Sequence, residues 1–182
     1  VAYWGHQFEV GGYATSYIPT DGSTVTRNQD VCNNGGSLAT INSTEGVLYA
    51  EIAALSNDGT YRILSLSNGT SVERIYMQYT NASNSISVVV KNGSVTQANI
   101  GFVLADETNF SKIAFKFKQN DFALWVNGVK VGTDTSGNTP IGLSELAFDS
   151  GTGNNPFFGK TKALAVWKEA LSDSELQSLT TI

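Results

Sequence analysis

The stretch Phe110–Val131, FSKIAFKFKQNDFALWVNGVKV, decides the fold of this chain. Apolar and polar residues alternate on both sides of the turn at Gln119–Asp121, which predicts two antiparallel strands. The pair Asn127-Gly128 then predicts a type I′ turn, because both central positions of that turn need a positive φ, which Asn-Gly adopts at low cost. A third strand follows directly, so we expect a meander of three antiparallel strands.

The two faces of this meander differ, because successive side chains of a strand point to opposite sides of its sheet. One face is apolar and belongs to a core, with Ile113, Phe115 and Phe117 on the first strand and Phe122, Leu124 and Val126 on the second. The other face places Trp125 beside Ala123 and opposite a strand that carries Lys112, Ala114, Lys116 and Lys118. What this second face does is the functional question that the stretch poses.

The composition predicts an all-β domain. The chain has 182 residues, which suffices to bury a core, and only 15% of them are charged while 18 are glycine. Short strand-like runs recur between turn signals, as in β-sandwiches and jelly rolls. Outside the meander we expect strands over 37–41, 47–55, 61–67, 71–79, 85–90, 94–100, 143–148 and 157–167.

Two of these elements need a separate argument. The run Val47–Leu55 fits a helix and a strand equally well by periodicity, and we assign a strand because glycine-containing turns flank it and its neighbours are strands. Residues Ser172 to Glu175 form a capping-box pattern, in which the serine and the glutamate satisfy each other's backbone amides at a helix start. We therefore expect one short helix at the end of the chain.

Charge and residue counts exclude several classes of function. The net charge of −5 comes without a basic stripe, so no nucleic-acid partner is expected. Cys32 and His6 are each the only residue of their type, which excludes an intramolecular disulfide and a metal site built from cysteine and histidine. No run approaches the roughly 20 apolar residues of a membrane helix, so no membrane insertion is expected.

Catalytic constellations are also missing. A glycosidase needs two carboxylates about 5 to 10 Å apart, and Glu51, Glu73 and Glu145 each stand among neutral residues. No nucleophile elbow, phosphate-binding loop or paired-histidine zinc motif is present. We therefore expect no enzymatic activity.

Sugar binding without catalysis asks only for aromatic rings that stack on pyranose faces and for polar side chains that hydrogen-bond hydroxyls. Two groups have this make-up: Trp125 with Lys116, and Tyr76 with Arg74 and Gln78. The alternative for Trp125 is a packing role in the framework of the sandwich. Among the other aromatic residues we expect Trp167 and Phe158 in the core and Phe157 at an exposed rim, while Tyr61 and Tyr79 stay open.

A calcium ion is the one cofactor that the loops could hold, because carboxylate, amide and carbonyl oxygens are its usual ligands. Expected rim loops offer Asp106-Glu107, Asp134, and Asp149 with Asn154-Asn155. Asp149 is the best single candidate.

The segment Trp4–Asp30, WGHQFEVGGYATSYIPTDGSTVTRNQD, resembles the pattern W-G-x-Q-x-E-x-G-x-x-A-T-S-Y-I-P-T-x-G-x-x-x-T-R-x-x-D of bacteriophage tail and tail-fibre proteins. There it closes one jelly-roll module and leads into the next. The resemblance implies that residues 1–36 are the end of, or the linker from, a preceding module, and that residues 37–182 form a module of their own. It also implies a location in the virion or outside the cell, and the start at Val1 fits a piece of a longer polypeptide.

The second resemblance covers roughly residues 40–182 and is carried by Trp125–Gly128, Phe158-Gly159 and Ala170–Leu176. These motifs are similar to those of the laminin-G-like, concanavalin A-like lectin domains, in which a Y/W-V-N-G hairpin precedes an F-x-G and an A-L-S-x-x-E ending. The resemblance implies an all-β, two-sheet antiparallel jelly-roll sandwich. Thr161–Ala163 replaces the acidic triplet usual after F-x-G, so no acidic site is carried over there.

Together these observations predict a non-catalytic, lectin-like carbohydrate-binding module that recognises a host-surface glycan as part of a phage tail fibre or adhesin. The alternative is a structural or assembly domain of a virion, such as a decoration or trimer-contact module, with a homotrimer burying Trp125. A polysaccharide-degrading enzyme ranks last.

Overall fold

The computed structural model describes residues 7–8, 16–26 and 35–182. Most of the phage-like segment, together with His6 and Cys32, lies outside these residues. The described residues 16–26 contain no strand. Within the described residues, no helix combines the length and the apolar character that crossing a membrane would require.

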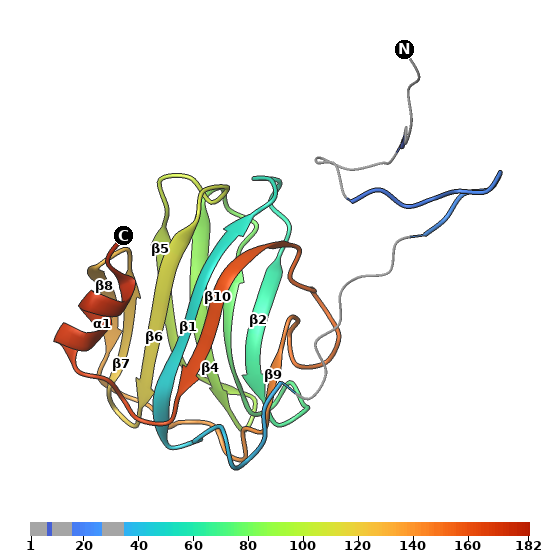
Figure 1. Ribbon diagram of the computed structural model, residues 1–182. Helices are drawn as coiled ribbons and strands as arrows, with labels where there is room; N and C mark the ends of the chain where they lie inside the picture. Colours follow the sequence, from blue (N-terminus) through green and yellow to red (C-terminus); the bar gives the residue numbers. More distant parts are fainter. Residues whose placement is uncertain (1–6, 9–15, 27–34) are drawn as a thin grey trace.

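In the part of the chain that the structure describes, ten strands build two antiparallel sheets of five strands each, a jelly-roll β-sandwich (Figure 1). Sheet A contains, in spatial order, β10 (Gly159–Trp167), β1 (Glu45–Ala54), β6 (Ser111–Lys118), β7 (Phe122–Val126) and β8 (Val129–Asp134). Sheet B contains, in spatial order, β5 (Val95–Val103), β4 (Ser85–Asn92), β3 (Arg74–Tyr79), β2 (Arg62–Ser67) and β9 (Glu145–Ala147). The all-β prediction is confirmed, and the run 47–55 is a strand.

The meander predicted over 110–131 is formed by β6, β7 and β8. Asn127 and Gly128 both have positive φ, 50° and 82°, as the type I′ turn requires. The predicted alternation holds as well. The apolar face of β6 and β7 enters the core between the sheets, where Phe115 and Phe122 stack with ring centroids 6.4 Å apart.

The outer face of sheet A is covered by the one helix in the described residues, α1 (Asp173–Thr180), which lies against β6, β7 and β8 (Figure 1). Its capping box is present: Ser172 is the N-cap, its hydroxyl accepts from the Glu175 amide, and the Glu175 carboxylate accepts from the Ser172 amide. Leu176 is fully buried in a second apolar cluster, with Val47, Tyr49, Ala114, Ala123 and Trp125. Small residues on β6 and β7 thus make room for the helix.

One predicted strand is wrong. Residues Ser37–Ile41 form a turn in which the amides of Thr40 and Ile41 donate to the Ser37 carbonyl at 3.0 and 2.9 Å. The side chains of Ser37 and Thr40 support the turn with further hydrogen bonds. Local side-chain bonding of this kind competes with strand pairing, which explains why the apolar residues of the segment do not extend into a sheet.

Candidate functional site

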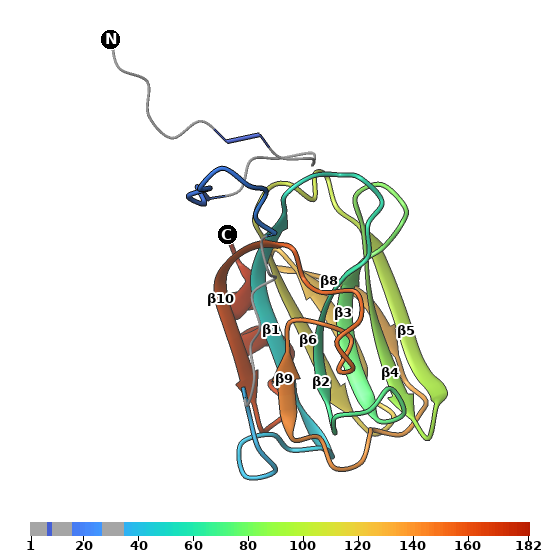
Figure 2. The same ribbon diagram turned by 90° about the vertical axis from the view of Figure 1, so that its right-hand side faces the viewer.

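A groove of about 530 Å³ lies on the outer face of sheet B, within the size range of small-molecule sites. Figure 2 looks onto this side of the molecule, where the loop that follows β9 passes in front of β2 and β3. The strands β2 and β3 and the residues beside them contribute Tyr61, Ile63, Ser71, Arg74, Tyr76 and Gln78. The loop contributes Ser150, Thr152, Asn154 and Asn155.

The groove residues of β3 share one face because the strand alternates strictly between core and surface. Ile75, Met77 and Tyr79 are buried, whereas Arg74, Tyr76 and Gln78 are half-buried on the other side. The register of β2 on β3 places Ile63 opposite Gln78 and Ser65 opposite Tyr76. The floor of the groove is therefore a small patch of two strands with mixed aromatic, amide and hydroxyl character.

The loop of residues 149–156 forms the wall of the groove and is held in place at three points. The Ile63 amide donates to the Asn155 carbonyl at 3.2 Å, and Nη1 of Arg74 donates to the Ser150 carbonyl at 2.6 Å. Gly151, with φ of 81°, packs so closely on β2 that an added Cβ would lie 2.7 Å from Oγ of Ser67. Only glycine fits there without moving the loop.

Two tyrosines give the groove its aromatic character. Tyr61 is 39% exposed and stands at the mouth, where it offers an accessible ring. The guanidinium of Arg74 lies over the ring of Tyr76, 4.6 Å from its centroid, so one face of that ring is already occupied. Burial raises the pKa of the Tyr76 hydroxyl, while the nearby Arg74 charge acts in the opposite direction. Tyr76 is therefore a neutral phenol in the ordinary pH range.

Gln78 and the loop add hydrogen-bonding groups. Nε2 of Gln78 donates to Oγ of Ser87 at 2.9 Å, which orients the amide and leaves its carbonyl oxygen without a donor among the described residues. Nδ2 of Asn154 donates to Oγ1 of Thr152 at 3.2 Å, so the loop side chains brace each other. No carboxylate lines the groove in the described part of the chain.

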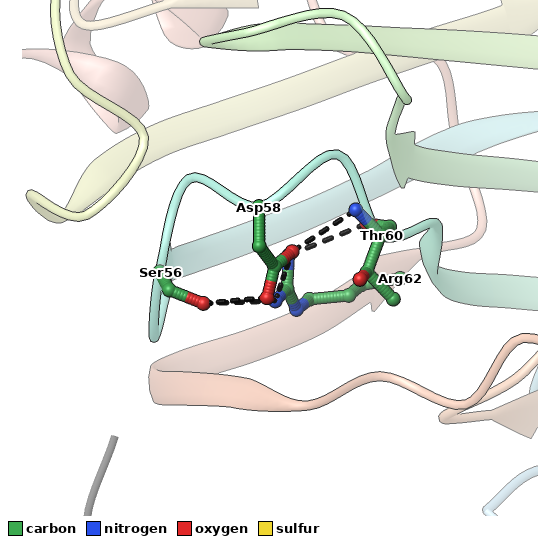
Figure 3. A network of polar contacts seen from close by, with 4 residues as sticks. All are labelled: Ser56, Asp58, Thr60 and Arg62. Atoms are coloured by element: carbon green, nitrogen blue, oxygen red, sulfur yellow. Dashed lines mark hydrogen bonds and ion pairs between the residues drawn. The ribbon is translucent and has the colours of Figure 1, made fainter. Parts of the chain in front are cut away.

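The backbone on both sides of Tyr61 is held by the network in Figure 3. Nη2 of the buried Arg62 donates to both carboxylate oxygens of Asp58 at 2.8 Å, and Asp58 also accepts from the Ser56 hydroxyl and the Thr60 amide. These hydrogen bonds, that of Ser56 foremost, hold the pKa of Asp58 well below its usual range. Because the bonds connect residues on both sides of Tyr61, they fix the backbone that presents this ring.

The predicted site residues fall into two separate places. Arg74, Tyr76 and Gln78 come together in the groove, and their role in ligand binding stays a prediction. Trp125 and Lys116 lie in sheet A, on the opposite side of the sandwich. Nζ of Lys116 is bound to the Asp121 carboxylate at 2.6 Å.

The expectation of an exposed Trp125 platform is wrong. The side chain is 5% exposed, because α1 covers the outer face of β7 and packs Leu176 into the same cluster. A ring covered by the chain's own helix can neither stack on a sugar nor be buried by a second copy of the chain. The framework role, left open as the alternative, is the one that the packing supports.

The prediction for the Phe157-Phe158 pair is reversed. Phe157 packs against the core, where its ring stacks on Tyr79 at 6.3 Å and meets Phe148 edge-on at 6.1 Å. Phe158 is 39% exposed. Tyr79 is buried, whereas Trp167 is half-buried beside Tyr49, with the two rings in an edge-to-face contact at 6.2 Å.

Calcium at Asp149 stays a prediction. Oδ1 of Asp149 accepts from the Gly151 amide at 2.6 Å, and Oδ1 atoms of Asp106 and Asp134 are bound to amides of their own loops in the same way. Glu107 is buried rather than at a rim. Among the described residues, no three His, Cys, Asp or Glu side chains gather as a metal would require.

Sequence reasoning missed Tyr61 and the loop residues Thr152, Asn154 and Asn155 as parts of one site. The alternation of Tyr61 with Ile63 and Ser65 was a usable signal for the face on which Tyr61 lies. The position of the 149–156 loop across that face depends on the pairing of β9 with β2, which joins residues about 80 positions apart and carries no local signal.

The fold is shared with several solved carbohydrate-binding proteins. The CBM40 of the Ruminococcus gnavus IT-sialidase, solved with α2,3-sialyllactose, is 22% identical with a TM-score of 0.64, covering 78% of this chain and 84% of that one. Domain 4 of the Geobacillus stearothermophilus extracellular arabinanase AbnA, solved with arabinotriose, is 12% identical with a TM-score of 0.61, covering 78% and 68%. The K499G mutant of the Streptococcus pneumoniae NanB sialidase is 14% identical with a TM-score of 0.66, covering 79% and 25%.

At these identities the structural likeness establishes the fold. A search of the curated proteins finds no match to the sequence. A family model described as the concanavalin A-like lectin/glucanases superfamily matches residues 20–177, which is most of the chain. The two-sheet sandwich, the hairpin at Asn127-Gly128 and this match agree, and the chain belongs to the concanavalin A-like lectin/glucanase superfamily.

Proposed function

We propose that the protein is a non-catalytic carbohydrate-binding module and that it binds its glycan in the groove on the outer face of sheet B. The observation that carries the proposal is the lining of this groove, which among the described residues contains an accessible tyrosine ring, a second tyrosine, amides and hydroxyls, and no carboxylate. Aromatic rings bind the apolar faces of sugars, and amide and hydroxyl groups bind their hydroxyls.

Two further points support this function. The solved relatives of the same fold include modules in complex with sialyllactose and with arabinotriose. Hydrolysis of a glycosidic bond uses a pair of carboxylates, and none lines the groove within the described residues. Both points favour binding over cleavage.

The setting that fits this module best is a phage tail fibre or a related extracellular adhesin that contacts a glycan on a host cell. The resemblance of Trp4–Asp30 to tail-protein segments supports this part of the proposal. The alternative, a trimer-contact domain, loses its main argument because Trp125 is covered within the chain. A homotrimer stays a prediction that sedimentation of the purified protein would test.

The test uses a glycan array followed by titration calorimetry with the best ligand. We expect Tyr61→Ala to weaken binding about tenfold, equivalent to roughly 1.4 kcal/mol, because a hot-spot ring is lost from the mouth of the groove. Phe158→Ala is the matched control: Phe158 is equally exposed, 39%, but does not line the groove.

An unchanged affinity of Tyr61→Ala, with both variants folded, would place the binding site elsewhere. A folded protein that binds no glycan on an array covering host-surface polysaccharides would contradict the function itself. Release of reducing ends from a bound polysaccharide would contradict its non-catalytic character.

A further inference from the structure

Among the described residues, the groove is lined by one charged side chain, Arg74, and no carboxylate of these residues forms an ion pair with it. Its Nη1 donates to a carbonyl, that of Ser150, and its buried Nε has no hydrogen-bond partner among the described residues. A neutral carbonyl satisfies one N–H group but leaves the positive charge in place, which is unfavourable for a half-buried group.

A second cation lies directly beside it. Lys91 of β4 is the cross-strand neighbour of Arg74 on β3, and Tyr76 opposite Val89 continues the same face. Residues in such a pair have Cβ atoms about 5 Å apart, and like charges in this position destabilise the sheet. No described carboxylate forms an ion pair with Lys91 or with Arg74. Other cations do have carboxylate partners: Arg62, Lys116, Lys118, Lys130 and Lys162.

The contrast matters because the chain as a whole is acidic, with a net charge of −5. Carboxylates are therefore plentiful on the surface, yet none neutralises the two cations at this end of the groove. The guanidinium is also held in one orientation by its contact with the Tyr76 ring and by its bond to Ser150. A planar, oriented guanidinium is suited to carboxylate and sulfate groups.

From this arrangement we infer that the ligand of the groove is an acidic glycan, whose carboxylate or sulfate group lies at Arg74 and Lys91 while a sugar ring lies toward Tyr61. The inference rests on the proposed function, because it names the class of glycan that the same groove takes. Both kinds of acidic sugar present the same chemistry to these residues, namely a delocalised anion that accepts several hydrogen bonds.

Paired probes isolate the charge. Trigalacturonate and 3′-sialyllactose are each compared with their methyl esters, which differ in the carboxylates, and 3′-sulfated lactose is compared with lactose, which lacks the sulfate. Titration calorimetry with the full chain should show at least tenfold tighter binding of an acidic member than of its neutral counterpart. The pair that shows the preference distinguishes a carboxylate from a sulfate ligand. This preference should weaken as the salt concentration rises from about 20 mM to about 500 mM, since salt screens the attraction between the anionic ligand and the two cationic side chains.

Variants of single residues identify the side chains that cause the preference for the acidic probe. Lys91→Gln should lower the affinity for the acidic probe about three- to tenfold and that for the neutral probe by less, because the side chain of Lys91 forms no hydrogen bond or ion pair with the described residues and acts through its charge. Lys160→Gln is the matched control, since Lys160 is an exposed lysine of β10 in the other sheet without an ion pair. Arg74→Lys, which keeps the charge but not the planar guanidinium, should retain part of the acidic preference, and Arg74→Gln should lose it, with thermal unfolding used to confirm that both fold.

The two proposals fail in different ways. Equal affinity for acidic and neutral probes, or acidic binding that Lys91→Gln and Arg74→Gln leave intact, would overturn the acidic-glycan inference while the carbohydrate-binding function stands. Absence of binding to any member of the paired sets and the array would overturn both.

Discussion

Arg62 is a buried cation with one close ion pair among the described residues. Its side chain is 2% exposed, and the carboxylate in this pair is that of Asp58, which is 40% exposed (Figure 3). Asp58→Asn would remove this ion pair and leave the guanidinium with only the longer-range attraction of the buried Glu107 carboxylate. Breaking a fully buried ion pair costs roughly 3–5 kcal/mol, and we expect about 2 kcal/mol here because water reaches and screens Asp58. Urea unfolding at pH 7 measures this loss.

The pH dependence gives this prediction a second readout. The folded pKa of Asp58 lies below its ordinary value of 3.8, so the ion pair contributes fully above that value, and its contribution is lost as the pH falls toward the folded pKa. The difference in unfolding free energy between the wild type and Asp58→Asn should be constant from pH 7 to about pH 5 and shrink in acid. Glu45→Gln, which removes a surface pair with Lys118, is the control and should cost clearly less than Asp58→Asn, because solvent screens an exposed pair. A loss for Asp58→Asn no larger than that of the control would show that Arg62 needs no partner.

At the scale of single residues, the sequence predicted the face of the strand on which a side chain lies better than it predicted how deeply that side chain is buried. The alternation of β3 placed Arg74, Tyr76 and Gln78 on one side and Ile75, Met77 and Tyr79 on the other, as observed. Whether a face is open depends on what covers it. Trp125 was assigned to the correct side of β7, but the helix that buries it comes from residues nearly 50 positions later, and no local pattern specifies that contact.

At the scale of elements, α1 is the part of the fold whose start the sequence specifies most directly. Ser172→Ala removes the hydroxyl that accepts from the Glu175 amide and should destabilise the protein by about 1 kcal/mol, the usual loss for an N-cap. Because α1 covers Trp125, fluorescence of the tryptophans and urea unfolding both report the change. Ser174→Ala, in the first turn but not at the cap, is the control: it removes only the hydroxyl contact with Oγ of Ser172 at 3.2 Å, leaves the Glu175 amide bonded to Ser172, and should have little effect.

A loss for Ser172→Ala equal to that for Ser174→Ala would mean that the apolar contacts of Leu176 alone hold the helix.

Capping boxes and Asn-Gly turns could be predicted because the residues that cause them lie within four positions of one another. The turn over Ser37–Ile41 was mistaken for a strand because its hydrogen bonds come from polar side chains inside an otherwise strand-like run.

At the scale of the whole molecule, the order of strands within each sheet could not be read from the sequence. β1 lies between β10 and β6, and β2 lies between β3 and β9, so β1 pairs on both sides, and β2 on its β9 side, with segments far away in the chain. The family resemblance gave the sandwich, but not which outer face stays open. The groove exists because α1 covers sheet A while only the 149–156 loop crosses sheet B.

The same organisation predicts where the folding unit begins. Among the described residues, the buried apolar side chains run from Ile41 to Leu176, and the groove lining runs from Tyr61 to Asn155. A chain that starts at Ser37 should therefore unfold within about 2 °C of the full chain, a difference that corresponds to less than roughly 1 kcal/mol, and bind the same glycan with the same affinity. Differential scanning calorimetry and titration calorimetry measure the two quantities.

A chain that ends at Leu171 is the opposite case, since it lacks α1 and uncovers Trp125. Losing the fully buried Leu176 alone would cost roughly 2–5 kcal/mol, so this chain should melt at least 5 °C below the full chain. Should the chain starting at Ser37 instead melt as low as the one lacking α1, the boundary between residues 36 and 37 would be wrong, and residues before it would belong to the folding unit. If its stability held but its glycan affinity fell, those residues would contribute to the binding site rather than to the core.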